Sequence, residues 1–136
     1  MRHMAHMAQT TKTTTIVIRR NAAKEEITEW IYREVVRAWQ ESHMVDFDIV
    51  LGFDNIALSI KPSASREERV EICEQCNENE LLRIRGTIYI PIIDEGTDML
   101  AETLAGMVME YPDYACYIGT LLFLGVRDVR VRRFKP

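Results

Sequence analysis

The segment from Leu82 to Ile92 constrains the fold more than any other, because apolar and polar residues alternate along it. One parity carries Leu82, Ile84, Ile88, Ile90 and Ile92, and the other carries Arg83, Arg85, Thr87 and Tyr89. A period of two is typical of a strand that buries one face and exposes the other. We therefore expect a long half-buried strand here.

Two shorter segments upstream predict a pair of strands. The first apolar set is Phe47, Ile49 and Leu51, and the second, after a turn that contains Gly52, Asp54 and Asn55, is Ile56, Leu58 and Ile60. Both sets alternate with polar or small residues. The β-branched residues from Thr13 to Arg19 predict an edge strand or an extended arm.

Two more segments near the C-terminus resemble strands. They are Tyr117 to Val126 and Val129 to Phe134. Their apolar parity shifts at Arg127 and Asp128, which predicts a bulge or a turn at that point.

Two segments have the spacing of amphipathic helices. In the first, apolar residues recur three or four positions apart: Ile27, Trp30, Ile31, Val35, Ala38 and Trp39. Asn21 is its expected N-cap, and Glu25 and Glu26 suit the positive end of the helix dipole. The second helix is expected from Asp98 to Tyr111, opened by Thr97 and ended by Pro112.

The order of these elements predicts an α+β fold with an antiparallel, or mixed, sheet and two main α-helices on one face, because strands and helices do not alternate regularly. We assign residues 13–136 to a single domain and residues 1–12 to a disordered N-terminal tail. Residues 67–76 fit a strand or a helix, and a strand followed by a turn is preferred.

Composition excludes several classes of protein. With 136 residues, 47% apolar and 28% charged, the chain suits one globular domain. No apolar run is long enough to span a bilayer, so no membrane partner is expected. The odd cysteine count of three indicates a reducing compartment, and the net charge of −4 indicates that nucleic acid is not required.

Cys73 and Cys76 form the one motif with possible metal or redox chemistry. Two thiolates three positions apart can share a zinc ion or form a reversible disulfide. Zinc needs four ligands, and the remaining candidates, Cys116 and His43, are single residues far apart. We therefore expect incidental cysteines, no bound metal and no cofactor.

No other group of residues predicts catalysis. Asp46, Asp48 and Asp54 lack the spacing of a calcium loop and fit a solvated strand face. His43 has no nucleophile placed near it in a known motif, and a histidine at the negative end of a helix explains it. The protein is therefore not expected to be an enzyme.

The C-terminal arginines alternate in part with Val129 and Val131, which predicts a strand with one cationic face. Such a face can contact nucleic acid or an acidic subunit surface. It can equally protect an edge strand against aggregation. The sequence leaves both interpretations open.

The order of motifs from Trp39 to Pro112 resembles the tail-completion, or tail-terminator, proteins of long-tailed bacteriophages. A helix ending at Trp39 leads to the turn with Asp54 and Asn55, then to a strand that contains Gly86, and Gly96 precedes the second helix. The loop before that helix is shorter than is usual in the family. The Cys73/Cys76 pair and the basic C-terminus are also not typical of it.

The resemblance implies a structural virion protein, made in the host cytoplasm, that joins the tail to the head connector. Its partners would be copies of itself, in a ring that is typically hexameric, and other tail-tube and connector proteins. Ring closure requires contact between two different surfaces. The expected interface residues are Asp94, Glu95, Asp98, Arg127, Arg130, Arg132 and Arg133.

Two alternatives remain from the sequence. One is a small regulatory or immunity-type module that acts by binding a partner protein. The other is a zinc or thiol protein that uses Cys73 and Cys76.

Overall fold

The computed structural model describes residues 13–19, 21–53, 55–63, 80–89, 95–110 and 114–133. The elements follow in the order β1 (Thr14–Ile18), α1 (Lys24–Ser42), β2 (Val45–Gly52), β3 (Ile56–Pro62), β4 (Glu80–Ile88), α3 (Glu95–Met109), α4 (Ala115–Phe123) and β5 (Val126–Arg133). The predicted α+β class is confirmed. Residues 1–12 and 67–76 lie outside the described ranges, so the expected tail and the choice between strand and helix stay predictions.

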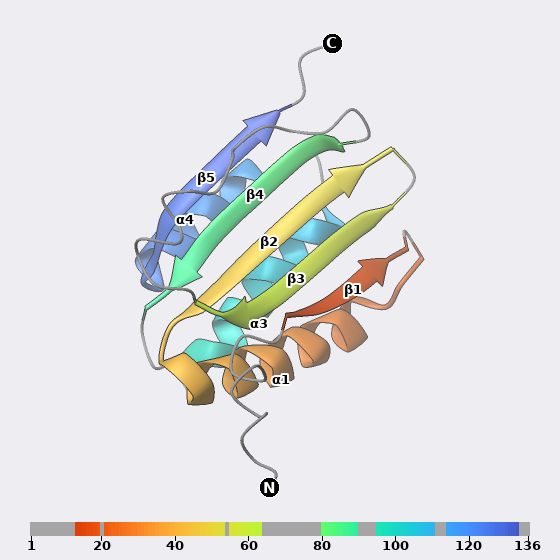
Figure 1. Ribbon diagram of the computed structural model, residues 1–136. Helices are drawn as coiled ribbons and strands as arrows, with labels where there is room; N and C mark the ends of the chain where they lie inside the picture. The colour runs from red at the N-terminus through yellow and green to blue at the C-terminus, as the bar shows by residue number, and fades with distance from the viewer. Residues whose placement is uncertain are drawn as a thin grey trace, which may run out of the picture.

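The strands form one antiparallel sheet in the order β1-β3-β2-β4-β5 (Figure 1). β2 and β3 are a hairpin in which Phe47 pairs with Ile60 and Ile49 pairs with Leu58. The burial of β2 alternates along its whole length, as the period-two pattern predicts. β1 and β5 are the two edges of the sheet among the described strands.

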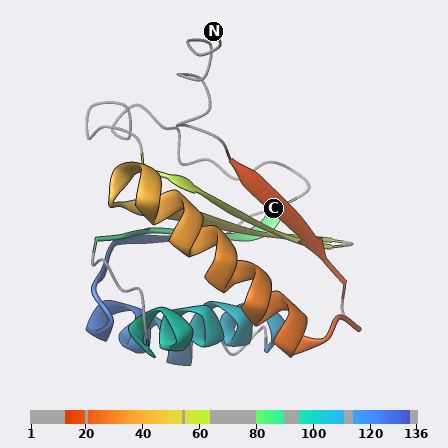
Figure 2. The same cartoon turned by 90° about the horizontal axis from the view of Figure 1, so that it is seen from below.

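The three described helices pack on one side of the sheet. Figure 2 shows α3 and α4 below the sheet, and α1 running obliquely from the level of the sheet down to them. α3 packs against both α1 and α4, so the helices lie in the order α1, α3, α4 across that face. The layer seals a core whose largest fully buried side chains include Phe47, Ile31, Leu58, Leu100 and Leu121. α1 contributes the buried stripe Ile27, Ile31, Val35 and Ala38.

Most predicted elements are confirmed, with shifted ends. β2, β3 and β4 lie where the alternation predicts them, and the described part of β4 ends at Ile88. Of the two expectations for the β-branched segment at residues 13–19, the edge strand is confirmed as β1. α3 begins at Glu95, three residues before the expected start at Asp98. Asn21 does not cap α1: its N-cap is Ala23, which makes no side-chain capping bond.

The predicted strand Tyr117 to Val126 is wrong, because residues 115–123 form the helix α4. The apolar side chains that face the core are Tyr114, Tyr117, Ile118, Leu121 and Leu124, spaced three or four apart. This is the helical period, and a dense run of apolar residues conceals it from a search for alternation. The described part of the chain therefore contains a third helix beside the two expected.

The predicted irregularity at Arg127 and Asp128 is confirmed. Arg85 pairs with Arg130 and Thr87 pairs with Arg127, so two residues of β5 stand opposite Gly86 alone. Asp128 has a φ of 57°, in the left-handed region. This β-bulge lets Val126 face the core and still turns Arg130 to the opposite face of the sheet.

Candidate interaction surfaces

The predicted interface residues lie on two separate parts of the molecule. Asp98 is exposed on α3, and Glu95 is the first residue of that helix. Asp94 lies outside the described residues. The four arginines Arg127, Arg130, Arg132 and Arg133 are all exposed on the edge strand β5. Of the predicted acids, only Asp98 has a described side chain, and it lies on a different element, α3, from the four arginines on β5.

The sheet face away from the helices carries four arginines on two neighbouring strands. Arg83 pairs across the sheet with Arg132, and Arg85 pairs with Arg130. Directly opposed like charges are unfavourable in a sheet. Asp48 offsets part of this charge, because Arg83 donates to its two carboxylate oxygens at 3.0 and 2.6 Å.

The other two arginines of β5 contact the two ends of α4. Arg133 Nη2 donates to the Tyr114 hydroxyl at 2.6 Å, and its guanidinium lies 5.6 Å from the centre of that ring. Arg127 Nη1 donates to the backbone oxygen of Leu122 at 3.0 Å. These contacts hold Arg127 at the C-terminal end of α4 and Arg133 near its N-terminal end.

An open groove of about 500 Å³ runs between α1 and α3. Thr28 and Tyr32 line it from α1, together with Lys24, and the carboxylates around it are Glu25, Glu29, Asp98 and Glu102. The groove is therefore acidic and contains one aromatic ring. It is the surface to which Asp98 belongs.

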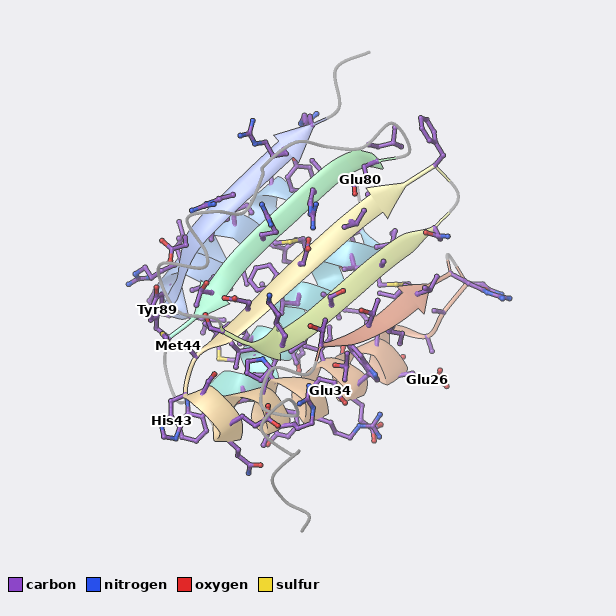
Figure 3. All side chains as sticks on the ribbon, in the orientation of Figure 1. Glu26, Glu34, His43, Met44, Glu80 and Tyr89 are labelled. Carbon is purple, nitrogen blue, oxygen red and sulfur yellow. The ribbon has the colours of Figure 1, made fainter. Side chains whose placement is uncertain are left out.

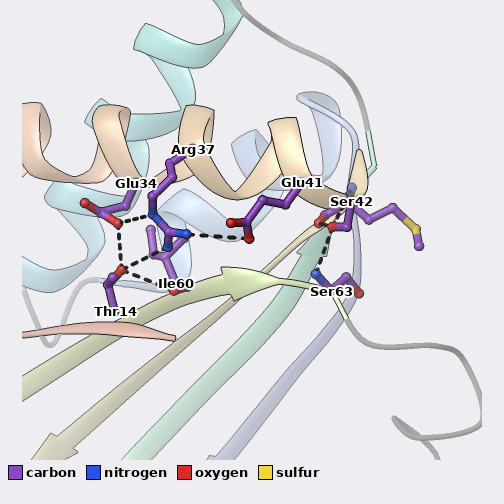
Figure 4. Close-up of polar contacts among 8 residues, drawn as sticks. Thr14, Glu34, Arg37, Glu41, Ser42, Ile60 and Ser63 are labelled. Carbon is purple, nitrogen blue, oxygen red and sulfur yellow. Dashed lines mark hydrogen bonds and ion pairs between the residues drawn. The ribbon is translucent and has the colours of Figure 1, made fainter. Parts of the chain in front are cut away.

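A polar network ties α1 to the edge strand β1 (Figure 4). Glu34 accepts hydrogen bonds from Thr14 and Arg37, each at 2.8 Å, and Arg37 also reaches Glu41 at 3.7 Å. Partial burial alone would raise the pKa of Glu34, but the hydrogen bonds from Arg37 and Thr14 and the positive charge of Arg37 together hold that pKa below its ordinary value. The network fixes the flank of the molecule at β1.

The residue patterns missed an apolar surface on α4. On α4, Phe123 is 84% exposed and Leu122 is 45% exposed. The helix contains no charged residue. A helical reading of residues 114–124 would have placed both side chains on the outer face, opposite Tyr117 and Leu121.

The remaining candidates have structural roles or lie outside the described residues. Asp46 accepts a hydrogen bond from Thr87 at 2.7 Å, and it shares the solvent-side face of β2 with Asp48. His43 ends α1 in the left-handed conformation, 4.7 Å from the ring of Trp39, and Figure 3 shows it at that helix end. Cys73, Cys76 and Asp54 fall in the ranges that are not described.

Within the described ranges, no three His, Cys, Asp or Glu side chains gather into a possible metal site. No helix in this part of the chain combines the length and the hydropathy needed to cross a membrane. Comparison of the chain with known protein families, with curated proteins and with solved structures gave no match.

Proposed function

We propose that the protein is a structural subunit that assembles into a ring at the end of a phage tail tube and joins the tail to the head connector. The order of the described elements supports this proposal. A helix precedes the β2–β3 turn and Gly86 lies in the long strand β4, as the resemblance implies. Gly96 departs from the resemblance, because it lies in the first turn of α3 and not before that helix.

The observation that carries the proposal is that the molecule has two unlike flanks. Among the described strands, the sheet ends in β1 on one side and in β5 on the other, and the described helices follow the same order. A ring is closed by a heterologous contact, in which one flank of each copy meets the other flank of the next. Two different edge strands on one chain suit such a contact.

The charges of the two flanks are complementary. β5 carries four arginines and one aspartate. α1, on the other flank, carries five glutamates against one lysine and two arginines, and α3 carries three acidic residues and no basic one. Opposite charges favour joining the β5 flank to the α1 flank over joining two copies of the same flank.

Electron microscopy of the purified protein tests this proposal. Closed rings with a central opening are expected, and six-fold averages would match the implied hexamer. Isolated particles of single-chain size at micromolar concentration, from protein with an intact circular dichroism spectrum, would refute it.

A binding module for another protein is the second candidate, because the exposed apolar face of α4 is a surface of the kind that such modules use. A folded chain that stays monomeric in solution, with the outer face of α4 exposed to solvent, would favour this function.

A further inference from the structure

The outer face of α4 is uncharged over its full width. At 100° per residue, the exposed positions of α4 span an arc of about 160°. In order around the helix they are Leu122, Ala115, Gly119, Phe123, Cys116 and Thr120. A helix at the surface of a globular protein normally carries charged residues on its outer face, whereas a helix that is apolar all round is buried against something.

Phe123 is the most exposed large apolar side chain of the described residues, at 84%. Burying an aromatic side chain removes a large apolar area from water and is therefore favourable. Leu122 beside it in sequence is also open to solvent, and Gly119 leaves open space where a Cβ would lie. An incoming surface can therefore approach the α4 backbone closely and bury Phe123.

We propose that the outer face of α4 packs against a second copy of this chain, with Phe123 seated in the groove between α1 and α3 of that copy. This inference rests on the proposed ring, and it names the helices that form each contact. α4 lies against β5, and α1 lies beside β1, where Thr14 bonds to Glu34. Joining the β5 flank of one copy to the β1 flank of the next therefore brings α4 to the neighbouring α1.

The groove suits this occupant in shape and charge. Its volume of about 500 Å³ accommodates an aromatic side chain, and the ring of Tyr32 and the methyl group of Thr28 offer apolar contact. The rim carries Glu29 and Asp98. Arg127, held at the end of α4 by its bond to Leu122, brings a positive charge to that rim.

A contact between two α4 helices is less favourable. It would bring together two copies of the arginine-bearing β5 flank, whereas the groove offers carboxylates to the same arginines.

Substitution of the anchor is the first test. Phe123→Asp is expected to weaken association at least about tenfold, because a carboxylate would enter an acidic groove. The matched control is Phe53→Asp, since Phe53 is a phenylalanine that is also exposed, at 59%, but lies at the end of β2. The control is expected to assemble as the parent does. Equal assembly of the two variants would overturn the proposal.

Cross-linking identifies the surface that receives Phe123. In a parent in which Cys73, Cys76 and Cys116 are replaced by serine, one variant carries Phe123→Cys and another carries Thr28→Cys. A covalent dimer is expected after mild oxidation of the mixture and not of either variant alone. Cross-linking of Phe123→Cys with itself would overturn the proposal in favour of an α4–α4 contact. Circular dichroism of each variant checks that it is folded.

These tests distinguish failure of the α4 contact from failure of the proposed ring. If the parent forms rings and Phe123→Asp forms them equally well, the ring stands and the α4 contact is wrong. If the folded parent is monomeric, the proposed function fails, and the α4 contact fails with it.

Discussion

Gly86 lies where β2, β4 and β5 meet, and its missing side chain decides how closely they pack. A Cβ at this position would lie 2.7 Å from Phe47 Cε2 and 3.0 Å from Val126 Cγ1. Both neighbours are fully buried, so neither can move away without disturbing the core. The Gly86 of the resemblance thus has a packing role that is independent of function.

Gly86→Ala is expected to lower the free energy of unfolding by about 1–3 kcal/mol through overpacking. Urea unfolding followed by circular dichroism measures the change. The loss should be smaller when Phe47→Leu is already present, because leucine lacks the ring atoms that clash. An unchanged unfolding midpoint would contradict this account.

The lowered pKa of Glu34 makes stability depend on pH. Because the pKa in the folded state lies below the ordinary value of 4.5, the ionised carboxylate stabilises the fold above pH 4.5. That contribution is lost as pH falls through the folded-state pKa. Glu34→Gln is therefore expected to lower the free energy of unfolding by about 1 kcal/mol at neutral pH. Solvent around the network screens the charges and keeps this loss small.

The unfolding free energies of Glu34→Gln and the parent should converge as the pH is lowered from 4.5 through the folded-state pKa of Glu34. Glu26→Gln is the matched control, because Glu26 is exposed on the same helix. A difference between parent and Glu34→Gln that stays constant with pH would refute the assignment.

At the scale of elements, replacing glycine by alanine should change stability in opposite directions at two positions, one in α3 and one in α4. A Cβ on Gly119 would meet nothing within 4 Å, so Gly119→Ala should stabilise the protein by about 0.5–1 kcal/mol through helix propensity. A Cβ on Gly106 would lie 2.9 Å from the ring of Tyr117, so Gly106→Ala should push α4 from α3. The expected loss is about 1 kcal/mol. Thermal unfolding of both variants checks the opposite signs.

The sequence predicts an element well where one face is buried and the other is exposed to solvent. β2 and β4 have this property, and so does α1, because solvent on one side makes the period visible. α4 lacks charges on its wet face, so the pattern did not reveal its period. The bulge at Asp128 was predictable because it reverses the parity of β5 around it.

The positions of the expected interface residues in the fold were predictable only in part. The clustering of arginines on β5 is visible in the sequence. That Arg130 and Arg133 lie on opposite faces of the sheet depends on the bulge. The groove beside Asp98 depends on how α1 packs against α3, and its members Thr28 and Glu102 are far apart in sequence. No local pattern records such a pairing.

At the scale of the whole molecule, the proposed assembly through oppositely charged flanks should be sensitive to salt. Raising sodium chloride from about 0.05 M to about 0.5 M shortens the Debye length severalfold and so screens the charges of the two flanks. The higher salt concentration should therefore shift the proposed oligomer toward monomer. Arg132→Glu should weaken assembly further at low salt. Arg19→Glu makes the same charge change on the β1 flank and should not weaken it.

The central claim is that the chain works as a ring-forming subunit, and its mass in solution tests that claim most directly. Light scattering coupled to size exclusion, over a range of protein concentrations, measures this mass. The account predicts a species of six 15.8 kDa chains, about 95 kDa, or a rise toward that mass as concentration increases. A folded protein that stays at the mass of one chain at every concentration would contradict it.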